Sequence, residues 1–367
     1  MTTSIPTRMK GVYLPGDRKC EIRDVEVPTP QHGQVLVEMR ASTICGSDLR
    51  AIYRPKIHKT GAEGYNGVIA GHEPCGLIVK RGPGVNDKWK EGTRVIVYHI
   101  QGCGFCHPCR RGEYISCTGE DRKAYGWQRD GGHGEYILVD QQSLVILEEP
   151  LTYLDGAMIA CGIGTSYAAC ARASVSGKDI VLVTGLGPVG LGTALIAARL
   201  GARVIGLEFD QDRVDFARSL GIESIACSGN DADDVSTIVK IAGGEGVHVS
   251  IDCSGNSSVR LTCMKSMRAW GRVVFVGEGG TVTFDVSELV IHKSLAIFGS
   301  WVCSISQMEE LVEKLVRWNL HPEIAITHTF TIEDAARAYG LFDSGKTGKC
   351  AITYKGETKQ HVYNVDK

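Results

Sequence analysis

The chain has 367 residues, of which 43% are hydrophobic and 22% charged, and its formal net charge at pH 7 is −2. This length and composition indicate a folded protein with a sizeable core and two domains. A charge so close to zero gives no general attraction to nucleic acid or to a membrane surface. The sequence contains no apolar run of membrane-spanning length and no apolar signal-peptide core near Met1. We therefore expect a soluble, cytoplasmic protein.

Short strand-like runs fill roughly the first 150 residues. They are expected at residues 34–39, 68–79, 94–100 and 135–139. Their β-type residues are separated by glycine, proline and aspartate, as in Arg81-Gly82-Pro83-Gly84, which is typical of turns between strands. This pattern predicts a β-rich, partly barrel-like domain.

Four cysteines follow one another closely within residues 100–120. Their pattern is C-x2-C-x2-C-x7-C, formed by Cys103, Cys106, Cys109 and Cys117. Four thiolates at tetrahedral corners make a closed zinc site that holds a loop together and does no chemistry. Two disulfides or scattered free thiols are the alternatives. Zinc is favoured because fourteen cysteines in a chain of this length suit a reducing compartment.

The pattern changes near residue 155 to alternating helices and strands. Strands are expected at residues 179–184, 203–208, 224–227, 247–252 and 271–276. Helices are expected at residues 154–173, 188–200, 211–220, 234–242 and 257–267, and after Leu295 the chain returns to mixed structure with an amphipathic helix at residues 306–318. Such alternation predicts a parallel sheet with helices on both faces. The polar residues 355–367 are expected to be loosely held.

A glycine motif follows the first apolar strand of this region. The segment Gly185-Leu186-Gly187-Pro188-Val189-Gly190 is a G-x-G-x-x-G that opens a helix. In such a motif Gly185 allows the tight turn, Gly187 admits the pyrophosphate to the backbone, and Gly190 lets helix and strand pack closely. The segment therefore predicts dinucleotide binding, with phosphates at the helix start. A glycine turn in an unrelated α/β fold is the alternative.

An acidic residue ends the second strand of the same region. Glu208 lies eighteen residues after Gly190. A carboxylate there accepts hydrogen bonds from the adenosine ribose and repels a 2′-phosphate, so NAD is favoured over NADP. Arg213 either contacts a phosphate or is a solvated helix arginine.

Three further motifs complete a family pattern. Cys45 lies in Ile44-Cys-Gly-Ser-Asp-Leu-Arg50, His72 in Gly71-His-Glu-Pro74, and Cys161 in Ile159-Ala-Cys-Gly-Ile-Gly-Thr165. With the cysteine lobe and the glycine motif, nearly the whole chain resembles the zinc-dependent medium-chain alcohol dehydrogenases, whose superfamily includes polyol and threonine dehydrogenases. The resemblance implies an α/β fold with a doubly wound (Rossmann) NAD-binding domain at residues 163–297. It also implies a β-rich, GroES-like catalytic domain at residues 1–162 and 298–367.

The resemblance implies a role for single residues. Cys45, His72 and Cys161 match the catalytic zinc ligands, and Glu73 matches a carboxylate close to that ion. Ser47 matches the hydroxyl that binds the substrate oxygen, and Asp48 matches the carboxylate that orients His72. Thr165 falls where the family contacts the nicotinamide, and the four lobe cysteines match the structural zinc site. Two zinc ions per chain and NAD are the implied cofactors.

The implied activity is an NAD-dependent oxidation of a CH–OH group. Three protein ligands leave one zinc position open, where the ion would acidify an alcohol before hydride transfer. We expect a small secondary alcohol such as a polyol or cyclitol. An L-threonine 3-dehydrogenase-like or primary-alcohol dehydrogenase is an alternative, because polyol relatives often carry Glu where this chain has Cys161. A non-catalytic nucleotide-sensing protein is the alternative from another class, and the intact ligand set argues against it. A homodimer or homotetramer is expected.

One position departs from the family pattern. Arg50 stands where many relatives carry a proton-relaying histidine, and arginine stays protonated in proteins. The relay is then expected to run through the cofactor ribose, water or another histidine. The basic segment Arg50, Arg54, Lys56, His58 and Lys59 either binds an anionic group or is a solvated loop, which we favour.

Overall fold

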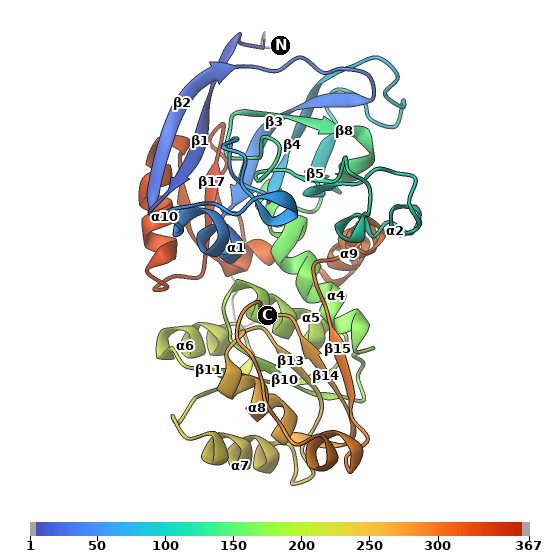
Figure 1. The fold of residues 1–367 in the computed structure, drawn as a ribbon, viewed down its shortest axis with the longest axis vertical. Helices are drawn as coiled ribbons and strands as arrows, with labels where there is room; N and C mark the ends of the chain where they lie inside the picture. The colour runs from blue at the N-terminus through green and yellow to red at the C-terminus, as the bar shows by residue number, and fades with distance from the viewer. Residues whose placement is uncertain (1–4, 362–367) are drawn as a thin grey trace. The chain divides into compact units, whose positions relative to one another are not determined.

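The computed structural model describes residues 5–361, apart from the side chain of residue 62. The described chain divides into two compact units, one of residues 5–164 and 303–361 and the other of residues 165–302 (Figure 1). The domain limits that follow from the family resemblance, after residues 162 and 297, stay a prediction. No helix of the described residues is long and apolar enough to cross a membrane.

A seven-stranded sheet forms the centre of the first unit. Its order is β16-β17-β3-β4-β5-β9, and β8 also pairs with β3. Their bounds are Ile326–Phe330 (β16), Lys349–Thr353 (β17), Gln34–Thr43 (β3), Pro74–Arg81 (β4), Arg94–Val97 (β5), Leu144–Ile146 (β9) and Tyr136–Asp140 (β8). Strand β3 is buried along most of its length because the sheet's apolar core packs against it. Its end carries the chain directly to Cys45.

The remaining elements of the first unit are short. The strands are β1 (Arg8–Gly16), β2 (Lys19–Glu26), β6 (Ile100–Gln101) and β7 (Lys123–Ala124). The α-helices are α1 (Gly46–Asp48), α2 (His107–Arg110), α3 (Tyr153–Met158), α9 (Ile305–Trp318) and α10 (Ala335–Asp343). The 3-10 and π turns are η1 (Leu49–Tyr53), η2 (Gly61–Glu63), η3 (Tyr114–Ser116), η4 (Gln141–Ser143), η5 (Ile159–Ile163), η7 (Pro322–Ala325) and η8 (Ile332–Asp334). Antiparallel strands β6 and β7 close the loop that carries the four lobe cysteines.

The second unit is the predicted doubly wound domain. Its six-stranded parallel sheet has the order β12-β11-β10-β13-β14-β15. The strands are Glu223–Ala226 (β12), Arg203–Glu208 (β11), Ile180–Thr184 (β10), Val247–Asp252 (β13), Met267–Phe275 (β14) and Ala296–Gly299 (β15). The helices are α4 (Gly164–Arg172), α5 (Pro188–Arg199), α6 (Gln211–Ser219), α7 (Asp231–Ile241), α8 (Ser257–Lys265) and the π turn η6 (Ser287–Ile291). Helix α5 packs on β10 and β11, and α8 packs on β10, β13 and β14 (Figure 1).

Two segments differ from their predicted secondary structure at functionally placed residues. The strand expected at residues 68–79 begins only at Pro74, because Gly71 has a φ of +90° and cannot continue a strand. The single helix expected at residues 154–173 consists of α3, the π turn η5 and α4. A π turn adds one residue to a helical turn and re-aims the side chains that follow, so helical spacing alone does not reveal it. His72 and Cys161 lie in these two irregular segments.

The end of the described chain is more firmly held than its polar composition predicts. The ammonium group of Lys359 donates hydrogen bonds to the carbonyls of Ile324 and Ile326, at 3.1 and 2.7 Å. The backbone N–H groups of Gln360 and His361 donate to a carboxylate oxygen of Glu323. The expectation of a loose end is wrong for residues 359–361, whereas residues 362–367 lie outside the described residues.

Candidate active site

Four side chains from three separated segments converge in the first unit. Cys45 follows β3, His72 and Glu73 precede β4, and Cys161 lies in η5. The ligand atoms of these four residues all lie within 4.8 Å of one another. His72, Glu73 and Cys161 are buried, and Cys45 is partly exposed. The structure thus brings together the catalytic-site residues that the sequence motifs predicted, across more than a hundred residues of chain.

Asp48 fixes the orientation of His72. Its carboxylate is fully buried and accepts a hydrogen bond from Nδ1 of His72 at 2.7 Å. The same carboxylate accepts from Nε1 of Trp127 and from the backbone N–H of Cys45, both at 3.1 Å. Because Nδ1 is occupied, Nε2 of His72 is the nitrogen left to face the two cysteines. Ser47 lies between Gly46 and Asp48 in α1 and is half-buried.

Glu73 is anchored by residues that the sequence motifs did not reveal. Its carboxylate accepts from the Thr43 hydroxyl at 2.6 Å and from the backbone N–H of Gly162 at 3.2 Å. The ammonium group of Lys349, itself 1% exposed, lies 2.5 Å from the same carboxylate. The only signal in the sequence is that Lys349 directly precedes the apolar run Cys350-Ala-Ile352. A buried lysine needs such a partner, because an unpaired charge in the interior is costly.

The electrostatics of the cluster separate the two thiols. A hydrogen bond from the Cys161 thiol holds the pKa of Cys45 well below its usual value, aided by the charges of Lys349 and His72. The same hydrogen bond, together with burial, raises the pKa of Cys161. Burial disfavours a charged imidazole, yet the Asp48 carboxylate and the Cys45 thiolate raise the pKa of His72. Burial also raises the pKa of Glu73, against the opposing charge of Lys349.

This donor set fits zinc. Thiolate sulfur, imidazole nitrogen and carboxylate oxygen are the ligand types that zinc accepts in proteins, and two thiolates balance its charge. The carboxylate of Glu73 is already balanced by Lys349. The residues that would hold the ion are Cys45, His72 and Cys161, with Glu73 beside it. Metal binding there releases the protons that the cluster otherwise holds.

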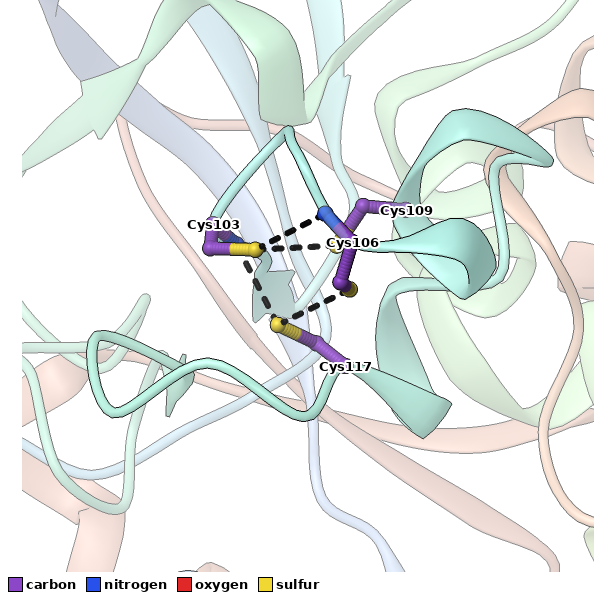
Figure 2. Close-up of side chains that lie close together, drawn as sticks. All are labelled: Cys103, Cys106, Cys109 and Cys117. Carbon is purple, nitrogen blue, oxygen red and sulfur yellow. Dashed lines mark hydrogen bonds between the residues drawn. The ribbon is translucent and has the colours of Figure 1, made fainter.

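The four lobe cysteines form a second cluster. Figure 2 shows their sulfur atoms turned toward one another from a single loop. The sulfurs of Cys103 and Cys109 lie 4.0 Å apart and those of Cys106 and Cys117 lie 3.8 Å apart. Four sulfurs at zinc-bond length from one ion are separated by about 3.8 Å, so the loop is already shaped for a tetrahedral site.

Backbone N–H groups stabilise thiolates in this lobe. The backbone N–H groups of Thr118 and Cys109 lower the pKa of the Cys106 thiol to about 6. Backbone N–H groups of Cys106 and Phe105 likewise lower the pKa of Cys103. Burial raises the pKa of Cys109 to about 12, so this thiol needs a metal to become a thiolate.

The glycine motif has the close contacts that its spacing predicts. A Cβ on Gly190 would lie 1.8 Å from the carbonyl oxygen of Gly185. Helix α5 can therefore pack this closely against the preceding turn only because residue 190 has no side chain. Gly185 has a φ of +78°, which glycine adopts readily. A Cβ on Gly187 would meet only the Arg213 guanidinium at 3.8 Å. Pro188 and Val189 form the first turn of α5, and the Val189 carbonyl accepts from the Ser166 hydroxyl.

Glu208 contacts the glycine motif directly. Its carboxylate accepts from the backbone N–H of Leu186 at 2.7 Å, and from those of Phe209 and Asp210. The Arg213 guanidinium lies 3.9 Å from the same carboxylate. Glu208 also lines a cavity of about 290 Å³ at the carboxyl ends of β11 and β13, with Phe209, Asp231, Ser254 and Asn256 among the other lining residues. Thr165 is buried near the start of α4.

A buried ion pair braces the neighbouring strand ends, and the sequence motifs did not reveal it. Arg260 on α8 donates from Nε to the Asp252 carboxylate at 3.0 Å. Its other nitrogens donate to the carbonyls of Gly277 and Gly280, in the loop after β14. The Thr184 hydroxyl donates to Asp252 from the end of β10. Three adjacent strands are therefore tied together at the edge where open α/β sheets bind ligands.

Comparison with known proteins identifies the family. Residues 188–317 match the zinc-binding dehydrogenase family, and residues 31–149 match the alcohol dehydrogenase GroES-like domain family. An uncharacterised zinc-type alcohol dehydrogenase-like protein of Escherichia coli is 47% identical over 94% of this chain and 99% of its own. The chain belongs to the zinc-type alcohol dehydrogenases. It is therefore an oxidoreductase, and the predicted family and fold class are confirmed.

Other similar proteins are less closely related to this chain and carry the name of an activity. Sorbitol dehydrogenase of Halalkalibacterium halodurans is 30% identical, over 90% of this chain and 95% of its own. L-threonine 3-dehydrogenase of Pyrococcus horikoshii is 32% identical, over 91% and 95%. An Escherichia coli alcohol dehydrogenase crystallised with NADH has a TM-score of 0.84 and 25% identity, with 95% of this chain and 100% of that chain covered.

The basic segment of this dehydrogenase is partly neutralised within the first unit. The Arg54 guanidinium forms an ion pair with Asp343 at 2.5 Å. His58 shares a hydrogen bond with the Ile52 carbonyl, and Lys59 pairs with Glu63. Arg50 and Lys56 are exposed. The segment therefore resembles the solvated loop more than a preformed anion site.

Two glycine substitutions in the motif should have opposite effects. Gly190→Ala should lower the free energy of unfolding by about 1–3 kcal/mol, because its Cβ overlaps the Gly185 carbonyl. Gly187→Ala should leave stability within about 0.5 kcal/mol but weaken dinucleotide binding, because its Cβ enters only the space that a pyrophosphate approaches. Urea unfolding and fluorescence titration measure both effects. Equal stability of the two variants would contradict the steric role of Gly190.

Removal of one lobe thiol should act on stability. Cys103→Ser should reduce bound zinc from two ions per chain to one and lower the thermal midpoint by more than about 4 °C, because the loop loses the ion that holds it. Atomic absorption and calorimetry give the two values. Cys20→Ser, a change at a half-buried cysteine far from both clusters in sequence, is the matched control and should keep two zinc ions. An unchanged thermal midpoint in Cys103→Ser would contradict a structural role of the zinc site in the lobe.

Proposed function

We propose that this enzyme oxidises a small neutral secondary alcohol, a polyol or cyclitol, with NAD as hydride acceptor. The observation that carries the proposal is the convergence of Cys45, His72 and Cys161, with Glu73, in a zinc-type alcohol dehydrogenase. Zinc bound there would act as a Lewis acid that lowers the pKa of an alcohol hydroxyl, and NAD would take up the hydride.

The protein's own residues set up that reaction. Asp48 holds the Nδ1 proton of His72, so that Nε2 keeps its lone pair for the ion. Lys349 balances the charge of Glu73, which lowers the cost of burying a carboxylate beside two thiolates. Ser47, adjacent to Asp48, would hold the substrate oxygen and accept its proton. Thr165 would contact the nicotinamide end of the cofactor.

The choice of NAD rests on the surroundings of Glu208. Its carboxylate lines the cavity at the carboxyl ends of the strands, and Asp231 lines the same cavity. Two carboxylates there would accept hydrogen bonds from the ribose hydroxyls and would repel a 2′-phosphate. The structural relative crystallised with NADH supports this choice. Arg213, next to Glu208, would stabilise that carboxylate more than it would bind a phosphate.

The choice of a neutral polyol rests on two observations. Arg54, His58 and Lys59 of the basic segment have partners within the first unit, which reduces the charge that is preformed for an acidic substrate. Sorbitol dehydrogenase is among the relatives. L-threonine and primary alcohols are the competing substrates, the former supported by the threonine dehydrogenase relative. The intact ligand cluster argues against a non-catalytic nucleotide sensor. A homodimer or homotetramer stays a prediction.

A substrate screen tests the proposal. The zinc-loaded enzyme should reduce NAD with polyols or cyclitols at a kcat/KM at least about 10-fold above that for L-threonine, hydroxy acids and ethanol. Cys45→Ser should abolish turnover while the circular dichroism spectrum stays unchanged, because the ligand is lost but the backbone around Asp48 remains. Cys20→Ser is the control and should keep full turnover. A preference for L-threonine, or full activity in Cys45→Ser, would refute the proposal.

Removal of the strand-end carboxylate should change the cofactor preference. Glu208→Ala should lower kcat/KM for NAD by about 10- to 100-fold, because hydrogen bonds to a charged group are lost, and should raise the NADP-to-NAD ratio. Glu223→Ala removes an exposed carboxylate that pairs with Arg203 and is the control. Steady-state kinetics with both cofactors measure the ratio. An unchanged ratio would show that Glu208 only supports the glycine motif.

A further inference from the structure

His99 lies beside the candidate ligand cluster but is not one of its members. It connects β5 to β6 together with Tyr98, and its ring centroid is 5.3 Å from that of His72, with the two ring planes at 61°. The residue is 5% exposed. A side chain this close to a zinc ligand is placed to contact a molecule that binds at the same centre.

The position of His99 is fixed by its backbone and by its ring. Its carbonyl accepts a hydrogen bond from the backbone N–H of Tyr125 at 2.9 Å. Nδ1 of its ring lies 2.9 Å from the carbonyl oxygen of Ala160, the residue before Cys161. The preceding residue, Tyr98, is fully buried and donates its hydroxyl to the Cys303 carbonyl at 2.6 Å. The imidazole is therefore held in one orientation next to the segment that presents Cys161.

The hydrogen bond to Ala160 determines which nitrogen of His99 carries the proton. A carbonyl oxygen can only accept, so Nδ1 is the donor and Nε2 keeps a lone pair in the neutral ring. A second proton is disfavoured, because it would place a charge in a buried side chain that has no carboxylate partner among the described residues. Nε2 of His99 is therefore a hydrogen-bond acceptor.

This acceptor has no donor. Nε2 of His99 makes no hydrogen bond with the described residues, whereas Nδ1 makes one. The unpartnered side-chain atoms that are closed to solvent include Nε2 of His133 but not Nε2 of His99. Because His99 as a whole is almost fully buried, its Nε2 reaches solvent only through a narrow opening.

The neighbouring polar groups, by contrast, have partners. The Asp48 carboxylate accepts hydrogen bonds from His72 and from Trp127, whose indole has only one donor. The Glu73 carboxylate is held by a hydroxyl, a backbone N–H and an ammonium group. A buried acceptor that stays unpaired is costly, so a molecule that offers a donor to Nε2 of His99 is favoured there.

We propose that Nε2 of His99 accepts a hydrogen bond from a donor group on the carbon next to the reacting carbon of the substrate. In a polyol or cyclitol this donor is the neighbouring hydroxyl, so the substrate class narrows to vicinal diols. The proposal rests on the proposed function, because it places the reacting hydroxyl at the cluster of Cys45, His72 and Cys161. The 5.3 Å between the rings of His99 and His72 restricts the contact to groups close to the reacting carbon.

The contact acts on specificity. A site that is built to hydrogen-bond a substrate hydroxyl rejects an analogue without it, because the acceptor in the site is then left unpaired. His99 orients the substrate through this bond, while the zinc ligands stay as they are. A simple secondary alcohol lacks the second donor and is therefore a poor substrate.

Two substrates that differ by one hydroxyl test this contact. With NAD, the zinc-loaded wild-type enzyme should oxidise 2,3-butanediol with a kcat/KM about 10- to 100-fold above that for 2-butanol, because only the diol has the neighbouring donor. The isomer 1,3-butanediol, whose hydroxyl groups are one carbon further apart, should resemble 2-butanol. A wild-type ratio of diol to 2-butanol below about 3 would overturn the proposal.

Two variants of His99 separate the hydrogen bond from a merely structural role. His99→Phe keeps a ring but removes the acceptor, and should bring the ratio of diol to 2-butanol to below about 3. His99→Gln should keep most of the ratio, because its amide N–H can donate to Ala160 while its oxygen accepts from the diol. Atomic absorption should find two zinc ions in both variants. An equal loss of kcat/KM for the two substrates in His99→Phe, with the ratio unchanged, would contradict the proposal.

The control is His328→Phe, which changes an exposed histidine on β16 of the same unit and should keep the wild-type ratio. If His99→Phe fails to fold, the wild-type ratio and His99→Gln decide.

The proposed function can fail separately from the role of His99. An enzyme that prefers L-threonine to every diol would refute the polyol assignment. It should then favour L-threonine over 3-hydroxybutanoate, which lacks the neighbouring ammonium donor, and should lose that preference in His99→Phe. A preference for L-threonine that His99→Phe retains would overturn the role of His99 as well.

Discussion

The buried carboxylate of Asp48 connects three segments on which the candidate active site depends. It accepts hydrogen bonds from the His72 imidazole, from the Trp127 indole and from the backbone of Cys45. A buried donor that loses its acceptor costs about 1–3 kcal/mol, so these three contacts are strongly favoured together. The carboxylate that fixes the tautomer of His72 through one oxygen also fixes, through the other, the turn that presents Cys45. Metal-ligand orientation and local backbone structure therefore share one cause.

Contacts within the protein stabilise the negatively charged groups of the candidate active site. Lys349 lies against Glu73, and the thiol of Cys161 donates to Cys45. The ammonium group of Lys349 thus stabilises the Glu73 carboxylate, and the proton of Cys161 stabilises the Cys45 thiolate. Zinc would not be the only positive group that stabilises these charges. The lobe cysteines have a different basis, because their thiolates are stabilised mainly by backbone N–H groups of their own loop. Their arrangement depends on the ion more than that of the catalytic cluster does.

Local spacing explains why the glycine motif and the cysteine lobe could be predicted from their own residues, whereas the set Cys45, His72 and Cys161 was predicted from the family resemblance. The glycine motif and the lobe each lie within fifteen residues, and steric contacts such as that between Gly190 and Gly185 are determined by the local chain path. The fold class follows from the same local periodicity. Lys349 and Thr43 could not be predicted as partners of Glu73, because the sheet that brings them together pairs β17 with β3 over three hundred residues. The π turn around Cys161 was missed because its small apolar residues also fit an α-helix.

For Glu208, the sequence motif predicted the position of the carboxylate but not all of its hydrogen bonds. Its spacing from the glycines predicts a ribose contact, yet the structure shows that its carboxylate also accepts the backbone N–H of Leu186, inside the motif. The carboxylate therefore shapes the turn that would receive the phosphates as well as the cavity beside it. With the proposed ribose contact, Glu208 would support both the phosphate-binding turn and the ribose, so cofactor affinity and cofactor choice would be coupled. Removing the carboxylate would therefore shift the preference toward NADP but would also weaken the binding of both cofactors, because the Leu186 contact is lost.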